Sequence, residues 1–205
     1  TSSNGKGGSA GEGTWTKVVA DGPSARARHA MAPLSDGRVL MYGGWDVNYN
    51  YLNDAWIYTP SSSSTSSNGK GGSGGGGTWT KVVAEGPSAR RWHAMAPLSD
   101  GRVLMYGGID VNNNDLNDTW IYTPSSTSTS SNGKGGSAGE GTWTQVADGP
   151  VGRTGHAMAP LSGGRVLMYG GQDDNNNNLN DAYIYTPSSS STSSNGKGGS
   201  GGGGT

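Results

Sequence analysis

The sequence contains no cysteine and no phenylalanine, and charged residues make up only 14% of it. Without cysteine, a disulfide framework and thiolate chemistry are excluded. No apolar run approaches the roughly 18 residues of a membrane-spanning helix, so no membrane span is expected. The net charge is −1 and lysine and arginine do not cluster. The basic surface of a nucleic-acid-binding protein is therefore missing, and no nucleic-acid partner is expected.

Glycine and serine are abundant but unevenly distributed. Glycine accounts for 39 of 205 residues, a bias that would predict disorder if it were even. Instead, the tryptophans and methionines recur in blocks separated by Ser/Gly tracts, and Trp15, Trp79 and Trp143 are spaced 64 residues apart. Such a period predicts a repeat architecture. We divide the chain into repeats 1–64, 65–128 and 129–191, followed by a Ser/Gly arm at 192–205. This arm ends in the phase in which the chain starts, so we expect further repeats beyond it.

Each repeat predicts four short strands and no helix. A continuous apolar run, Val39–Tyr42 in the first repeat, favours a strand buried on both faces, as between stacked sheets. Ser-Asp-Gly at 35–37 predicts a hairpin turn before it. Helical periodicity is not seen. In the first repeat the four expected strands fall within HAMAPL (29–34), GRVLMYGG (37–44), NDAWIYTP (53–60) and TWTKVVA (78–84).

Three features of each repeat resemble the kelch repeat. They are a Pro-x-x-Arg-x-x-His segment, a double glycine after the apolar run, and spaced aromatics further on. The double glycines are at 43–44, 107–108 and 170–171, and the aromatics are Trp56 and Tyr58, Trp120 and Tyr122, and Tyr183 and Tyr185. The resemblance implies an all-β fold of kelch-type β-propeller blades, each a four-stranded antiparallel sheet. It also implies that the Arg and His of each repeat support the blade by hydrogen bonding. Three blades do not close a ring, so we expect a longer array or an assembly.

The Ser/Gly tracts allow two interpretations. Eighteen residues lie between Pro60 and Trp79, and Asn-Gly near the middle of each tract (68–69, 132–133, 195–196) favours a two-residue hairpin turn. Pairing outward from the first turn sets Tyr58 opposite Trp79 and Ile57 opposite Thr80. The alternative is a flexible linker.

The hydroxyl-rich segments beside proline are typical of O-glycosylated stalks. Sugars there would shield a long hairpin edge from unwanted pairing. The expected O-linked positions are Ser61, Ser62, Ser63, Ser64, Thr65, Ser125, Ser126, Thr127, Ser128, Thr129, Ser188, Ser189, Ser190, Ser191 and Thr192.

The loops after the double glycines carry oxygen side chains at relative positions 1, 3, 5 and 9, a spacing like that of a calcium loop. The glycine at position 6 and the glutamate at position 12 of such a loop are missing. The alternative is that Asn and Asp tolerate left-handed turn conformations. No other cofactor is indicated. The candidate calcium ligands are Asp46, Asn48, Asn50 and Asp54; Asp110, Asn112, Asn114 and Asp118; and Asp173, Asn175, Asn177 and Asp181.

Two further groups of residues are candidates for function. His29, His93 and His156 recur in equivalent positions, where they could act as acid–base groups or ligands, or only support the blade. Trp45, Tyr49 and Tyr51 lie in the first loop, but Ile109, Asn113 and Asp115 replace them in the second. Such a variable tip is either a contact surface for sugar or protein or the product of neutral drift.

Near-identical repeats argue against an enzyme, because an active site needs different residues in different roles. We therefore expect a non-enzymatic extracellular structural protein that self-associates through its blades into a fibre or surface layer, with glycosylated tracts. The alternative is a closed kelch propeller that binds a protein or glycan through its loops.

Overall fold

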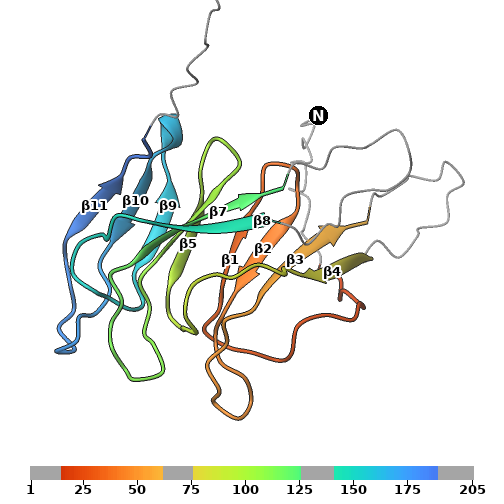
Figure 1. Cartoon of the computed structure of the whole chain (residues 1–205), viewed down its shortest axis with the longest axis horizontal. Helices are drawn as coiled ribbons and strands as arrows, with labels where there is room; N and C mark the ends of the chain where they lie inside the picture. Colours follow the sequence, from red (N-terminus) through yellow and green to blue (C-terminus); the bar gives the residue numbers. More distant parts are fainter. Residues whose placement is uncertain (1–14, 62–75, 126–140, 189–205) are drawn as a thin grey trace, which may run out of the picture.

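The structure, a computed structural model, describes residues 15–61, 76–125 and 141–188. These residues form three antiparallel sheets, which we call blades 1, 2 and 3 (Figure 1). The expected kelch-type all-β fold is thus confirmed. Blade 1 contains β1 (Ala30–Pro33), β2 (Val39–Tyr42), β3 (Ala55–Pro60) and β4 (Gly77–Lys81); blade 2 contains β5 (Ala94–Pro97), β6 (Val103–Tyr106), β7 (Thr119–Pro124) and β8 (Gly141–Val146); blade 3 contains β9 (Ala157–Pro160), β10 (Val166–Tyr169) and β11 (Ala182–Tyr185). A short 3-10 turn, η1 (Ser162–Gly164), joins β9 to β10. No helix among the described residues is long and apolar enough to cross a membrane.

The strands of a blade follow one another in sequence order, each paired with the one before. The turn between β1 and β2 needs a left-handed residue, which Gly37 supplies at φ 84°. The predicted apolar strand is fully buried in the middle blade, where all four residues of β6 are inaccessible. A strand buried on both faces is what stacked sheets require.

The register predicted across the first Ser/Gly tract is confirmed. In the pairing of β3 with β4, Tyr58 lies opposite Trp79 and Ile57 opposite Thr80. The two aromatic rings are 5.1 Å apart between centroids. The Asn-Gly positions themselves lie outside the described residues.

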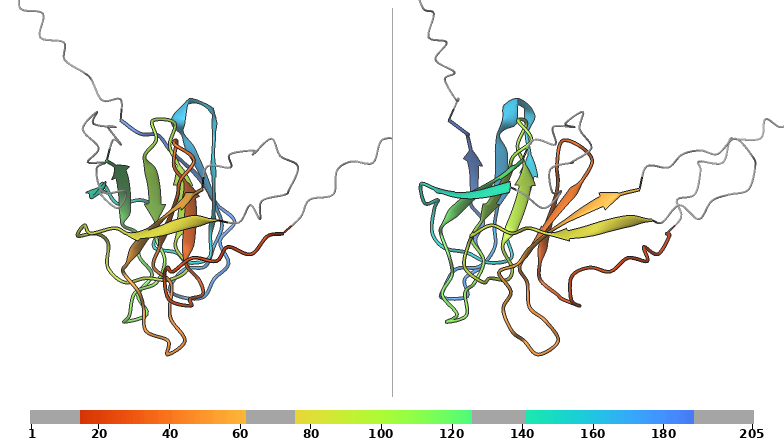
Figure 2. Two further views of the ribbon diagram at one scale, coloured as in Figure 1. Left: turned by 90° about the vertical axis from the view of Figure 1, so that its right-hand side faces the viewer. Right: turned by 45° about the vertical axis from the view of Figure 1, so that its right-hand side comes forward.

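The blades pack face to face, with β1 beside β5 and β5 beside β9 (Figure 2). One apolar cluster joins blades 1 and 2 and a second joins blades 2 and 3. Within the first cluster, Ile57 of blade 1 packs with Met105 and Trp143 of blade 2. Blade 2 is therefore covered on both faces by its neighbours.

A buried ion pair fixes the start of each blade. Arg90, which is inaccessible, binds both carboxylate oxygens of Asp118 at 2.6 and 2.7 Å and the carbonyl of Gly107 at 3.0 Å. The same pair recurs as Arg26–Asp54 and Arg153–Asp181. Burial alone would raise the pKa of Asp118, but the hydrogen bond and the charge of Arg90, together with the hydrogen bond from Trp120, outweigh it and lower the pKa. The arginine of each repeat supports its blade by hydrogen bonding, as the resemblance implied.

The double glycine joins one blade to the next. Gly44 donates its backbone N–H to the carbonyl of Arg90 in blade 2 at 2.9 Å. Both Gly43 and Gly44 have positive φ, and a Cβ on Gly43 would come within 2.7 Å of that same carbonyl. A side chain on Gly43 would therefore push against blade 2, whereas one on Gly44 would clash with Ala27 and His29 of its own repeat.

Candidate functional site: an arginine–aromatic patch

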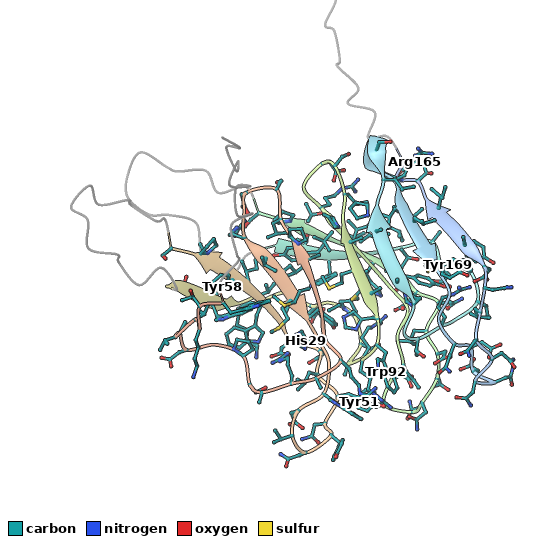
Figure 3. The ribbon with its side chains drawn as sticks, turned by 180° about the vertical axis from the view of Figure 1, so that it is seen from behind. His29, Tyr51, Tyr58, Trp92, Arg165 and Tyr169 are labelled. Carbon is teal, nitrogen blue, oxygen red and sulfur yellow. The ribbon has the colours of Figure 1, made fainter. Side chains whose placement is uncertain are left out.

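The loops that follow β2, β6 and β10 lie at one end of the blades, together with the segments that lead into the first strand of each blade. Figure 3 shows Tyr51 and Trp92 close together at this end, far from Arg165 at the opposite end. We call it the loop end. The sequence placed the variable tip, Trp45, Tyr49 and Tyr51, in one of these loops, and the structure shows what surrounds that tip.

Two arginines interleave with the aromatic rings. The guanidinium of Arg91 lies 4.4 Å from the ring centroid of Trp45 and 4.0 Å from that of Trp92. Arg28 lies 3.9 Å from the same Trp92 ring. Such separations allow a cation–π attraction of about 0.5–1 kcal/mol each at an exposed site. The rings and cations therefore hold one another in place.

A hydrogen bond and edge contacts complete the group. Arg91 Nε donates to the hydroxyl of Tyr51 at 2.6 Å. Tyr49 stands edge-on to Trp45 with centroids 4.9 Å apart, and its side chain is exposed. We define the arginine–aromatic patch as Arg28, Trp45, Tyr49, Tyr51, Arg91 and Trp92.

Three members of the patch have a left-handed backbone. Arg28 has φ 58°, Tyr49 has φ 64° and Trp92 has φ 57°. At the position of Arg28 and Trp92 the third repeat has Gly155 at φ 64°. The repeat geometry thus favours glycine there, and a bulky residue costs about 1–3 kcal/mol. Strain of this kind is typical of functional sites.

The patch is where the first two repeats differ. Between Trp15–Ser64 and Trp79–Ser128 the sequences differ at eight positions, and five of these are positions 27, 28, 45, 49 and 51 with their counterparts. Arg91 and Trp92 replace Ala27 and Arg28, so the patch exists only where blade 1 meets blade 2 in this way. Comparison of the repeats position by position is the signal that would have found the arginines and Trp92.

The equivalent place between blades 2 and 3 is acidic. The carboxylate of Asp174 accepts a hydrogen bond from the backbone N–H of Asp115 at 2.9 Å. Burial, and then the charges of Asp174 and Asp173, raise the pKa of Asp115 to about 6. At the loop end, the contact between blades 1 and 2 therefore carries positively charged side chains, and the contact between blades 2 and 3 carries negatively charged ones.

The candidate calcium ligands fall into two separate hydrogen-bonded sets. One oxygen of Asp46 accepts the backbone N–H groups of Asn48 and Asn50, and the other accepts the Asn50 side chain. Asp54 is instead paired with Arg26. Asp110 with Asn112 and Asn114, and Asp173 with Asn175 and Asn177, repeat the first set, while Asp118 and Asp181 repeat the second. Among the described residues, no three His, Cys, Asp or Glu side chains gather to hold a metal.

His93 and His156 lie between blades, whereas His29 is half-buried at the start of blade 1. His93 is buried and stands edge-on to Tyr42 of blade 1, and His156 stands likewise to Tyr106. Neither ring nitrogen of His93 or His156 makes a hydrogen bond of ordinary geometry. A weak hydrogen bond with the backbone of Tyr42 raises the pKa of His93, and one with Tyr106 raises that of His156, but burial outweighs both. Both rings therefore pack as neutral imidazoles, and the hydrogen-bonding support implied for the histidines stays a prediction. Burial lowers the pKa of His93 to about 3 and that of His156 to about 4.

Of the expected O-linked positions, only Ser61, Ser125 and Ser188 are described. Ser61 hydrogen-bonds through its hydroxyl to the carbonyl of Gly76 at 2.5 Å. The remaining positions, Ser62–Ser64 and Thr65, Ser126, Thr127, Ser128 and Thr129, and Ser189–Ser191 and Thr192, lie outside the described residues.

No protein-family model matches the chain. It is 25% identical over 160 residues to an F-box/kelch-repeat protein of Arabidopsis thaliana, covering 74% of this chain and 29% of that protein. It is 28% identical over 118 residues to mouse Kelch domain-containing protein 1, covering 53% of this chain and 24% of that protein. The solved structure of YjhT superposes with a TM-score of 0.54 at 13% identity, covering 78% of this chain and 43% of that one. The chain thus spans less than a third of either curated relative.

Stacked antiparallel blades, two of four strands and one of three in the described residues, define a β-propeller type of protein, and the superposition on YjhT is of the fold alone. The double glycines, the Arg–Asp pairs and the sequence relatives go further. The repeats of this chain are kelch-type repeats, similar to those of kelch-repeat proteins.

Proposed function

We propose that this chain is a non-enzymatic kelch interaction module that binds a protein partner through the arginine–aromatic patch. The observation that carries the proposal is the strain at Arg28, Tyr49 and Trp92, which is retained where glycine or asparagine would relieve it. Tryptophan, tyrosine and arginine are also the residue types that dominate binding energy in protein interfaces. The kelch-repeat relatives are similar in sequence, and the proposal takes nothing from their binding partners.

The test compares three immobilised chains: the wild type, the double variant Trp45→Ala with Tyr49→Ser, and a control, Arg165→Ala. Arg165 is an exposed residue of blade 3 at the end opposite Tyr51 and Trp92 (Figure 3). Each is exposed to an extract of the source organism, and retained proteins are quantified and then purified for direct binding. We expect at least one purified protein whose affinity falls tenfold or more in the patch variant and stays unchanged in the control. Equal affinity for all three chains would refute the proposal. Selective binding on a glycan array would instead identify the partner as a sugar.

A second function, a structural role through self-assembly, is favoured by the two end faces of the stack. Ile57 and Ile121 are 0% and 2% exposed inside it, whereas the equivalent Ile184 on the outer face of blade 3 is 53% exposed. At the other end, Met31 is 47% exposed and its interior equivalent Met95 is 8% exposed. The outer face of blade 3 and the outer face of blade 1 are therefore complementary, because the equivalent faces pack against each other between neighbouring blades.

Head-to-tail contacts of this kind build a fibre or surface layer when the rotation does not close. An extracellular location and O-glycosylated tracts belong to this second proposal. Negative-stain microscopy separates the two functions, since uniform rods support the fibre and isolated particles oppose it. A mass of the natural protein equal to that of the bare chain would refute glycosylation.

Calcium binding by the Asp/Asn loops remains a prediction. A bound ion would have to displace the N–H groups that now occupy Asp46 and its equivalents. Isothermal titration with calcium tests it, and absence of heat would refute it.

A further inference from the structure

The loop end carries two groups of opposite charge beside each other. A pocket of about 420 Å³, which we call the loop-end pocket, lies between blades 2 and 3 at this end. Arg91 and Trp92 of the arginine–aromatic patch line it, together with Asp115, Asp173 and Asp174. The positively charged patch therefore borders directly on an acidic hollow.

The two arginines of the patch have no carboxylate partner in the part of the chain that the structure describes. Arg91 is turned toward blade 1, where its guanidinium lies 4.4 Å from the ring centroid of Trp45 and its Nε donates to Tyr51. Arg28 is exposed and lies over the rings of Trp45 and Trp92. The ion pairs of residues 15–61, 76–125 and 141–188 include neither arginine. Both positive charges are therefore available to a group from outside the chain.

The aspartates of the loop-end pocket are also without a cationic partner among the described residues, since none of them belongs to those ion pairs. Asp174 is exposed, and one of its oxygens accepts the backbone N–H of Asp115 across the contact between blades. Burial, and then the charges of Asp174 and Asp173, raise the pKa of Asp115. The carboxylates thus repel one another, and a cation brought beside them would relieve the repulsion.

The opposite charges arise from differences between the repeats. Asp115 stands where the other two repeats have Tyr51 and Asn178, and Asp174 stands where they have valine. Arg91 stands where they have alanine and threonine. The aspartate at position 173, by contrast, has an equivalent in each repeat and distinguishes none of them. Each kind of charge therefore marks one contact between blades.

Two adjacent groups of opposite charge make the loop end complementary to itself. A second copy can be placed loop end to loop end, with a two-fold axis that lies in the plane of contact and runs between the patch and the pocket. The patch of each copy then faces the loop-end pocket of the other, so one rotation pairs both groups twice. A different acidic partner would satisfy the patch but leave the aspartates of the pocket unpaired. Charge complementarity of this kind also fixes the orientation in which two surfaces meet.

We propose that the partner of the arginine–aromatic patch is a second copy of this chain, and that the two copies dock loop end to loop end with Arg28 of each beside Asp174 of the other. Tyr49, which is 69% exposed, enters the loop-end pocket of the other copy. The pocket has room for it, because an apolar cavity of about 150 Å³ already admits a benzene ring. The inference rests on the proposed function of the patch, and it uses a different surface from the end faces of the stack.

The experiment is sedimentation velocity on residues 1–205 over a hundredfold range of concentration. We expect the wild type to form a dimer that weakens at least tenfold when the salt concentration rises from about 50 to about 500 mM, because salt screens exposed charges. Arg28→Asp and Asp174→Arg are each expected to weaken the dimer at least tenfold. Arg165→Asp, a charge reversal at the opposite end, is the matched control and is expected to change nothing.

An equimolar mixture of the two charge-reversed chains supplies the decisive result. Each copy then offers the charge that the other needs, so the mixture is expected to dimerise at least tenfold more tightly than either variant alone. This recovery also shows that both variants fold, as expected for exposed positions and for aspartate at a left-handed one. A mixture no tighter than its components would overturn the pairing, as would a wild-type association that neither reversal weakens.

The proposed function and this inference can fail separately. A wild type that stays monomeric at every concentration would refute the second copy as partner. If the immobilised chain nevertheless retained another protein through the patch, the interaction module would stand with a different partner. A species lost in the variants that is larger than a dimer would overturn the two-fold arrangement.

Discussion

The ring of His93 stands edge-on to the ring of Tyr42 across the joint between blades 1 and 2, with centroids 5.6 Å apart. Burial, and then the charge of Arg90, lowers the pKa of His93. The contact between the blades therefore favours the neutral imidazole of His93 and destabilises its protonated form. Because His156 repeats the arrangement, both blade joints share one dependence on pH.

This dependence gives the first prediction. In the unfolded chain the histidines protonate near pH 6.5, but in the folded chain the pKa of His93 is about 3 and that of His156 about 4. The unfolded state thus binds more protons below pH 6.5, and folding loses stability as the pH falls. We expect each histidine to cost about 1.4 kcal/mol per pH unit between about pH 6 and 4.

Urea unfolding at several pH values measures this loss. The variant His93→Gln is expected to halve the slope, while His29→Gln, at a half-buried position, changes it little. A slope in His93→Gln as steep as that of the wild type would contradict the assignment.

The second prediction concerns the buried ion pairs. Removing the guanidinium in Arg90→Ala leaves the carboxylate of Asp118 without its partner, at an expected cost of about 3–5 kcal/mol in the free energy of unfolding. Arg102→Ala is the matched control, because Arg102 pairs with Asp100 at 2.6 Å on an exposed turn. There the expected cost is below about 1 kcal/mol. Chemical denaturation measures both, and similar losses would show that burial does not decide the effect.

The third prediction distinguishes a patch residue proposed to act in binding from a residue that stabilises the fold. Trp92→Gly removes the contacts with Arg91 and Arg28 but relieves the left-handed strain of about 1–3 kcal/mol. We expect the free energy of unfolding to change by no more than about 1 kcal/mol while partner binding is lost. Trp143→Ala is expected to cost about 3–5 kcal/mol, because its indole fills a blade joint. Unfolding followed by circular dichroism compares them, and a comparable loss in Trp92→Gly would make that residue structural.

The fourth prediction concerns the acidic joint. The folded-state pKa of Asp115 is raised from 3.8 to about 6, so stability present at low pH is lost as the pH rises from 3.8 to about 6. Asp115→Asn is therefore expected to melt at a higher temperature than the wild type at pH 8 and at the same temperature at pH 4. Glu85→Gln, at an exposed carboxylate, serves as the control. A thermal shift in Asp115→Asn that is the same at both pH values would refute an electrostatic cause.

The architecture of each blade was predictable from the amino-acid sequence. The apolar run of β2, the turn at Gly37 and the register of Tyr58 with Trp79 all follow from local patterns, because alternation, turn chemistry and strand pairing act between residues close along the chain. The family followed from the double glycine and the arginine for the same reason. The role implied for the histidines stays a prediction, since a motif gives a position but not whether a neighbouring blade leaves a partner for the ring.

The surfaces on which function is proposed become visible only when the blades are stacked. Arg91 and Trp45 are 46 positions apart in the sequence, and nothing local shows that the next blade lays one over the other at 4.4 Å. The loop-end pocket is likewise lined by residues of blades 2 and 3, and it exists only because their sheets stack. Packing between repeats depends on contacts distant in sequence, so composition and periodicity define each blade but not what lies between two of them.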